Sequence, residues 1–185
     1  MGADDRAQCG RRIEEMQLAR LPDLARRDGD ALTIALFPAG TRIYRDTVDA
    51  HGERTYALWD YFDWINAVLL YTTDGERSEF LLLQRANGRD YVLPSDPVLS
   101  PDRKHLATAD FCASGCENRV SVWRVTPERI VRERSWRPPV PWSDASVRWK
   151  DAATVVLDYS VAGDAATRTL ESRIDATAWR LDAAP

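Results

Sequence analysis

The chain has 185 residues, of which 44% are hydrophobic and 29% are charged, a composition typical of a folded domain with a buried core. The 25 Lys and Arg residues against 29 Asp and Glu residues give a formal net charge of −4, which argues against general electrostatic binding to nucleic acid. Every apolar run is far shorter than the roughly 20 residues of a membrane-spanning helix, so no membrane insertion is expected.

Residues 1–27 are predicted to form a helical segment. Ile13 and Met16 follow helical spacing, and Pro22 disfavours a helical conformation at Leu21, so the helix is expected to end there. The start of the chain lacks the apolar stretch of a secretory signal, and a chain from which a signal had been removed would look the same.

Residues 28–185 are predicted to form a single β domain. Short runs of branched and aromatic residues alternate with Gly, Pro, Asn and Asp, which is a strand-and-turn pattern. Asp74-Gly75 and Asn87-Gly88 lie between such runs and tolerate the positive φ angles of tight hairpins. The predicted strands are 31–37, 42–48, 55–59, 66–72, 78–84, 90–93, 104–110, 119–126, 129–136, 146–150, 153–160 and 167–174.

The β region contains a weak internal repeat. Segment 98–108 matches segment 147–157 at one constant offset, with a valine strand, an Asp-bearing turn and a second apolar strand in each; segment 80–83 matches 120–123 less closely. Units of about 40–50 residues built from antiparallel meanders have the size of β-propeller blades. We therefore expect an all-β fold of about three to four repeated antiparallel meanders, propeller-like or sandwich-like, with a short N-terminal helix.

Two segments carry a family resemblance. Residues 99–107, with the sequence LSPDRKHLA, resemble the "SPDG" turn of exported TolB-like and WD40-type β-propellers, and residues 119–125 resemble the blade strand that usually ends in Val-Trp-Asp. Arg103 stands where the turn usually has glycine, and Arg124 stands where the strand usually has aspartate. The resemblance implies an exported, propeller-like repeat protein and specifies no activity.

The cysteines bear on the cellular compartment. Cys112 and Cys116 flank a loop with the flexible Gly115, and their spacing permits a small disulfide, which requires an oxidising compartment. Two free thiols or a metal site are the alternatives, and Cys9 either pairs with one of the two or stays free. We therefore expect a periplasmic or secreted protein, with a cytoplasmic location as the alternative.

A first candidate site is the aromatic and acidic segment 59–64. Trp59, Tyr61 and Trp64 alternate with Asp60 and Asp63. This pattern suits a sugar-stacking platform with hydrogen-bonding carboxylates, or an acid/base pair for glycoside cleavage. It equally suits a folded edge in which the rings belong to the core and the acids cap a turn.

A second candidate site is the proline-rich segment 136–142. Its prolines hold it extended, and Trp136 and Trp142 could fix it to the sheets as a stiff linker. Alternatively, Trp136, Arg137 and Trp142 form a docking strip, because Trp and Arg often dominate binding energy at protein interfaces.

Enzyme signatures are absent from the sequence. It contains no phosphate-binding glycine loop, nucleophile elbow or His-Glu-x-x-His motif, and only His51 and His105 could serve as a histidine base. We therefore expect no catalytic residue, no metal and no cofactor. The function that fits best is a non-enzymatic exported module that binds a protein partner, for example an immunity or inhibitor protein, with its oligomeric state left open. The alternative is a carbohydrate-binding or carbohydrate-cleaving protein that uses the segment 59–64.

Overall fold

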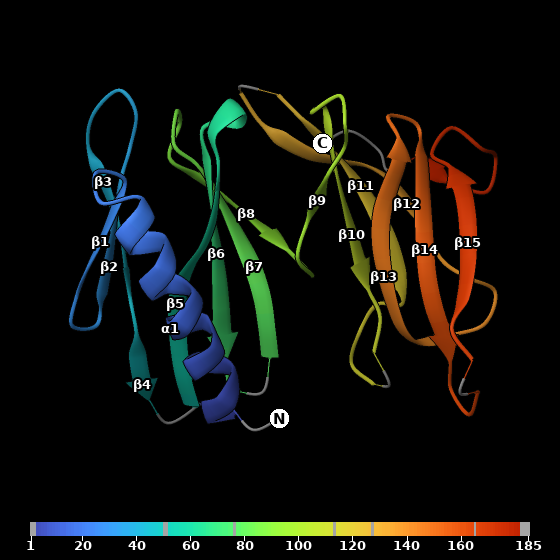
Figure 1. The fold of residues 1–185 in the computed structure, drawn as a ribbon, viewed down its shortest axis with the longest axis horizontal. Coiled ribbons are helices and arrows are strands. Elements are labelled where there is room, and N and C mark those ends of the chain that lie inside the picture. The colour runs from blue at the N-terminus through green and yellow to red at the C-terminus, as the bar shows by residue number, and fades with distance from the viewer. Residues whose placement is uncertain are drawn as a thin grey trace. The chain divides into compact units, whose positions relative to one another are not determined.

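The computed structural model describes residues 3–49, 52–75, 77–112, 114–126, 128–164 and 166–181. Apart from an N-terminal α-helix and a 3-10 turn, the described elements are antiparallel β-strands, which confirms the predicted all-β class with a short helix (Figure 1). The chain divides into two compact units, residues 1–93 (unit 1) and 94–185 (unit 2), and the predicted range 28–185 spans both. Each unit is described by itself.

Unit 1 contains two sheets built as meanders, in which each strand pairs with the next along the chain. Their strand orders are β1-β2-β3 and β4-β5-β6-β7-β8. The elements are α1 Ala3–Arg20, β1 Ala25–Asp28, β2 Ala31–Ala35, β3 Thr41–Arg45, β4 Thr47–Asp49, β5 Gly52–Phe62, the 3-10 helix η1 Asp63–Ile65, β6 Ala67–Asp74, β7 Arg77–Gln84 and β8 Arg89–Leu93.

The helical segment is shorter than the predicted range 1–27. Helix α1 ends at Arg20, before Pro22, as the sequence indicates. Strand β1 then begins at Ala25, which is buried and pairs with Ile34 of β2. Gly29, with φ of 56°, forms the turn between the two strands, so the end of the predicted helical segment belongs to a hairpin.

Both predicted hairpins are confirmed. Strands β6 and β7 pair around Asp74-Gly75, and β7 and β8 pair around Asn87-Gly88. Gly75 has φ of 57° and Gly88 has φ of 67°, the left-handed conformation that favours glycine in such turns.

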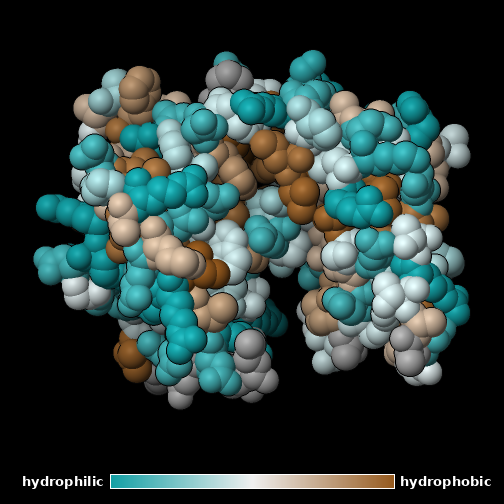
Figure 2. Space-filling model, in the orientation of Figure 1, coloured by the Kyte–Doolittle hydropathy of each residue, from teal (hydrophilic) through white to brown (hydrophobic). Residues whose placement is uncertain are grey.

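The core of unit 1 lies between its two sheets. Side chains of β2 meet those of β5, β6 and β7, and burial of each large aliphatic side chain contributes about 1.5–3 kcal/mol. On α1, a Cβ added at Gly10 would lie 3.0 Å from the Tyr71 ring, so glycine permits the helix to approach β6. The surface over α1 is mainly hydrophilic (Figure 2). The fully buried core residues include Leu32, Ile34, Leu58, Val68, Leu70 and Leu83.

Four charged side chains join α1 to the sheets. The Glu14 side chain is buried, and its carboxylate accepts hydrogen bonds from the Leu58 amide at 2.9 Å and from two guanidinium nitrogens of Arg27, each at 2.8 Å. A buried charge is tolerated only when it is paired and hydrogen-bonded in this way. We call this group the α1 ion cluster; its members are Arg11, Glu14, Arg27 and Asp46.

Unit 2 contains two further antiparallel sheets, with strand orders β16-β12-β11-β10-β9 and β13-β14-β15. The short strand β16 returns to the edge of β12 and was not predicted. The elements are β9 Val98–Leu99, β10 His105–Asp110, β11 Arg119–Val125, β12 Ile130–Trp136, β13 Trp142–Asp151, β14 Thr154–Val161, β15 Arg168–Arg173 and β16 Arg180–Leu181.

The two segments that match in the sequence both contain a turn closed by an aspartate. Asp102 Oδ1 accepts hydrogen bonds from the Ser100 hydroxyl at 2.7 Å and the Lys104 amide at 3.2 Å, and Asp151 Oδ1 accepts one from the Ala153 amide at 2.8 Å. Partial burial raises the pKa of Asp102, but these hydrogen bonds outweigh it and hold that pKa below its ordinary value. Asp102 and Asp151 therefore close their turns in the same way, by binding the amide two residues ahead.

The core of unit 2 is rich in aromatic rings. Trp142 is 4% exposed, and its ring stacks on Tyr159 with centroids 3.8 Å apart and an angle of 13° between the planes. The rings of Phe111 and Trp136 also pack against the Trp142 indole, with centroid distances of 5.0 and 5.4 Å. In the part of the chain that the structure describes, no helix is long and apolar enough to cross a membrane.

Candidate functional site

A pocket rich in arginine lies beside strands β11, β12 and β16 of unit 2. Its volume is about 270 Å³. Three of its six lining residues carry a guanidinium group, and a tryptophan contributes the large apolar side chain. We call it the arginine pocket; it is lined by Arg119, Ser135, Trp136, Arg137, Ala178 and Arg180.

Strand pairing brings the pocket residues together from distant parts of the sequence. Ser135 on β12 pairs with Arg180 on β16, and Trp136 pairs with Val120, the residue after Arg119 on β11. Arg180 is placed by Trp179, whose buried indole donates a hydrogen bond to the Ser172 hydroxyl at 2.9 Å and packs in the core. The sheet register therefore decides which arginines share the pocket.

One carboxylate already contacts two of the pocket arginines. Glu117 Oε2 lies 3.1 Å from Arg119 Nε and 3.8 Å from Arg137 Nη2. The Glu117 and Arg137 side chains are more than half exposed, and exposed ion pairs of this kind contribute at most about 1 kcal/mol. Within the described residues, the ion pairs place one carboxylate, that of Glu117, against two of the three pocket arginines, so Glu117 offsets the positive charge of the pocket only in part.

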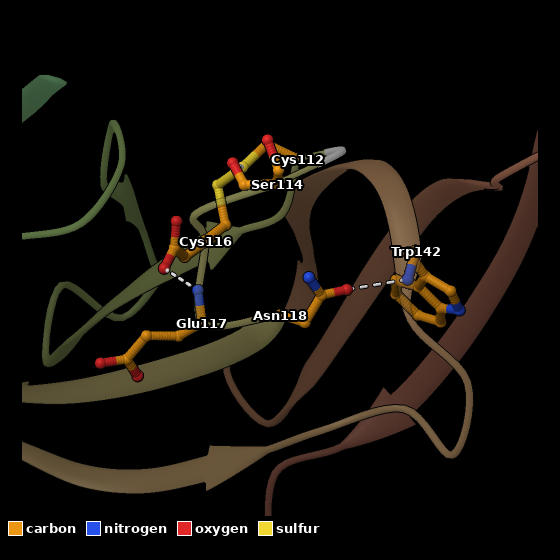
Figure 3. Close-up of a disulfide and its surroundings, with 7 residues drawn as sticks. Cys112, Ser114, Cys116, Glu117, Asn118 and Trp142 are labelled. Carbon is orange, nitrogen blue, oxygen red and sulfur yellow. Dashed lines mark hydrogen bonds between the residues drawn. A yellow bond between two sulfur atoms is a disulfide. The ribbon is translucent and has the colours of Figure 1, made fainter. Parts of the chain in front are cut away.

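A disulfide closes the loop that carries Glu117. Cys112 and Cys116 are bonded, with their Cα atoms 5.6 Å apart, which confirms the predicted pairing (Figure 3). Asn118, with φ of 51°, follows Glu117, and its side-chain oxygen accepts a hydrogen bond from the Trp142 amide at 2.8 Å. The loop is thereby tied to the start of β13. The remaining cysteine, Cys9, is exposed on α1 and is not in a disulfide.

The second predicted site, segment 136–142, divides between surface and core. Trp136 lines the arginine pocket, and Arg137 is exposed there, so two of the predicted binding residues lie at this site. Trp142 packs inside the core and does not present its ring to solvent. Between the two tryptophans, Val140 is 52% exposed. We call residues 137–141 the proline strip.

The first predicted site, segment 59–64, is not one platform. A bulge in the pairing of β5 with β6 occurs at Trp59, whose ring packs with Tyr71 and Phe80, each at 5.3 Å. The Tyr61 hydroxyl donates a hydrogen bond to the Asn66 side chain, and Tyr61 packs against the core that lies between the two sheets of unit 1. The rings of Trp59 and Tyr61 are therefore held in separate clusters.

The two carboxylates of segment 59–64 bind their own backbone. Asp60 Oδ1 accepts a hydrogen bond from the Tyr61 amide at 2.8 Å, and Asp63 Oδ1 accepts one from the Trp64 amide at 2.7 Å. Asp63 and Trp64 belong to η1, where Asp63 is exposed and Trp64 half-buried. Both carboxylates are thus bonded to the amide of the next residue, Asp60 within strand β5 and Asp63 at the start of η1.

His105, one of the two histidines, lies beside an acidic residue. His105 Nε2 lies 3.5 Å from Glu133 Oε2, and its ring lies 6.3 Å from that of Trp149. Glu133 also receives hydrogen bonds from the Arg124 guanidinium, which lower the pKa of its carboxyl group. His51 lies outside the described residues. Among those that are described, no group of three or more His, Cys, Asp and Glu residues is arranged to hold a metal ion.

Sequence reasoning missed Arg119 and Arg180 as members of a site. Arg119 begins the strand that resembles a propeller blade, a motif that marks no binding site, and β16, which carries Arg180, is too short to produce a strand pattern. The fold and the pocket define an all-β protein with a small basic site at the end of a sheet. Comparison of the chain with protein-family models, curated proteins and solved structures finds no match.

Proposed function

We propose that this chain is an exported, non-enzymatic binding module that recognises a protein partner, of the immunity or inhibitor type. One observation carries the proposal: the exposed proline strip is anchored by Trp136 and Trp142 and adjoins the arginine pocket. A stiff segment loses little conformational entropy on binding, and Trp and Arg are the residue types that most often dominate interface energy.

Export is supported by the Cys112–Cys116 disulfide, because structural disulfides persist mainly in oxidising compartments. In this proposal the protein acts in the periplasm or outside the cell. Protein from its own host, unfolded without reduction, should expose the thiol of Cys9 alone to an alkylating reagent. Reaction of all the cysteines would contradict export.

The repeated turns support a propeller-like relationship between the two matching segments. Asp102 and Asp151 each bind a backbone amide two residues ahead, and Arg103, in the place of the usual glycine, has φ of 60°. A position that requires positive φ favours glycine, so Arg103→Gly should preserve or raise stability. A marked loss of stability would count against this relationship.

The binding proposal can be tested with a photo-crosslinking amino acid introduced at Val140 and expressed in the native host. Ile43 of unit 1 is a matched control, because it is 51% exposed and Val140 is 52% exposed. We expect a discrete protein adduct from position 140 that Arg137→Ala diminishes, and none from position 43. Equal adducts at both positions, or none at 140, would contradict the proposal.

The carbohydrate alternative makes a different prediction. Soluble glycans bound at Trp59 or Trp64 would change tryptophan fluorescence, and Asp60→Ala would abolish the change. In our proposal glycans leave the fluorescence unchanged, because the Trp59 ring packs with Tyr71 and Phe80 and Asp60 bonds to the neighbouring Tyr61 amide.

A further inference from the structure

We infer that the arginine pocket binds the carboxylate of an acidic side chain in a partner protein, and that Glu117 holds this place in the unbound protein. The inference rests on the proposed function and specifies its chemistry. The three pocket guanidinium groups come from Arg119, Arg137 and Arg180.

The pocket is small but large enough for a single amino-acid side chain. Sites for drug-sized ligands have volumes of about 300–1,000 Å³. The arginine pocket, at about 270 Å³, is below that range. An Asp or Glu side chain from an extended segment fits this volume, and Trp136 belongs to the lining around it.

The chemistry of the pocket favours a carboxylate because one already contacts two of its arginines. Glu117 Oε2 is within 4 Å of both Arg119 Nε and Arg137 Nη2. Planar guanidinium groups match carboxylate geometry and bind it in a two-pronged manner. Since Glu117 is 56% exposed, it can turn toward solvent when another carboxylate enters.

The charge of the pocket leaves room for a second acid. Arg119 is only 18% exposed and is held against Glu117, whereas Arg137 is 57% exposed and more distant from it. Arg180, on β16, adds a third positive charge at the same pocket. The strip and pocket together therefore suit a partner segment with an acidic residue beside an apolar one, which would contact Val140.

The test is a titration of the full chain with a capped glycine-glutamate peptide at physiological ionic strength, followed by NMR of the indole and guanidinium signals. The matching glycine-glutamine peptide controls for the backbone. We expect saturable binding that shifts the indole NMR signal of Trp136. This signal is assigned as the one that is missing from the spectrum of Trp136→Phe. Arg180→Gln should weaken binding about tenfold, the loss of a charge-assisted hydrogen bond.

Two further variants separate pocket binding from general attraction. Glu117→Gln removes the resident carboxylate, which competes with the peptide for the arginines, so binding should tighten. The expected gain is only about threefold, because the exposed ion pair of Glu117 is weak. Arg148→Gln is the control, because it removes another exposed arginine, which lies on β13 and pairs with Asp158. This change should leave the affinity for the peptide unchanged. If Arg180→Gln fails to fold, the gain from Glu117→Gln still tests the inference.

Several results would overturn the inference. These are no saturable binding, equal weakening by Arg148→Gln and Arg180→Gln, or tighter binding of inorganic phosphate or single-stranded DNA than of the acidic peptide. The crosslinking experiment keeps this failure separate from that of the proposed function. An adduct at Val140 without peptide binding would support the proposed function and contradict the carboxylate site. Peptide binding without an adduct would support the carboxylate site and contradict the proposed function.

Discussion

The two units use arginine for opposite purposes. In the α1 ion cluster, Arg27 is 15% exposed and binds Glu14, Asp46 and the Tyr56 carbonyl, so its hydrogen-bonding capacity is used within the protein. In the arginine pocket, Arg137 is 57% exposed and its contact with Glu117 is 3.8 Å long. The comparison indicates that the number of internal partners separates a structural arginine from one available to a ligand.

The units also use different interactions to hold the segments that lie outside their sheets. Unit 1 holds α1 with buried charges that satisfy the backbone of β5, where Leu58 and Tyr56 donate their amides to Glu14 and Asp46. Unit 2 closes the loop from β10 to β11 with a disulfide and holds the start of β13 with a stack of aromatic rings.

The largest effect is expected for Trp142→Ala. The change removes a buried ring that stacks on Tyr159 and contacts Phe111, and it should lower the free energy of unfolding by about 3–5 kcal/mol. Urea denaturation followed by circular dichroism measures the loss. Val140→Ala, on the exposed strip, is the control and should change stability by less than about 0.5 kcal/mol. Similar values for both variants would mean that the ring stack does not secure this segment.

Glu14→Gln tests the buried charges of unit 1. The amide keeps one acceptor for Leu58 but loses the paired hydrogen bonds with Arg27, so we expect a loss of about 2–3 kcal/mol. Glu15→Gln changes an exposed neighbour on the same helix and should be nearly neutral. If the two variants are equally stable, α1 is held by apolar packing instead.

Replacement of Cys112 and Cys116 by serine should cost about 2 kcal/mol, the loop-closure estimate for so short a loop. Hydrogen exchange should report faster opening of the Trp142 amide, which Asn118 binds, while the amides of α1 stay unchanged. Cys9→Ser is the matched control. Unchanged exchange at Trp142 would show that the loop keeps its structure without the disulfide.

The smallest effect concerns pH and Glu133. Hydrogen bonds from Arg124 lower the pKa of Glu133, so the ionised form is favoured in the folded protein. The stabilisation is therefore fully present above the unfolded pKa of about 4.3 and is lost as pH falls through the lower folded value. Because Arg124 is 59% exposed, the contribution should be under about 1 kcal/mol.

This pH dependence is measured as the stability difference between the wild type and Arg124→Gln. The difference should be constant near neutral pH and shrink in acid. Arg129→Gln, an exposed residue of the same β11–β12 hairpin, should show no such change. A difference that grows in acid would contradict the sign of the lowered pKa.

The sequence was sufficient for local structure because the signals are local. Pro22 ends the helix, and Gly75 and Gly88 supply the positive φ that two hairpins need. The spacing of Cys112 and Cys116 permitted the disulfide that the structure contains, since a short loop keeps its two ends close, and it left free thiols or a metal site as alternatives. Strand β1 was missed because its four residues are too few to show the alternating pattern of a strand.

The sites depended on tertiary structure. Trp136 and Trp142 are the same residue type a few positions apart, yet one lines a pocket and the other is buried against Tyr159. In segment 59–64, a bulge in β5 decided that Trp59 and Tyr61 join different clusters. The arginine pocket arises because β16 returns to β12 and places Arg180 beside residues more than forty positions earlier in the chain. Turn geometry is encoded by neighbouring residues, whereas strand register and burial depend on the whole packed sheet.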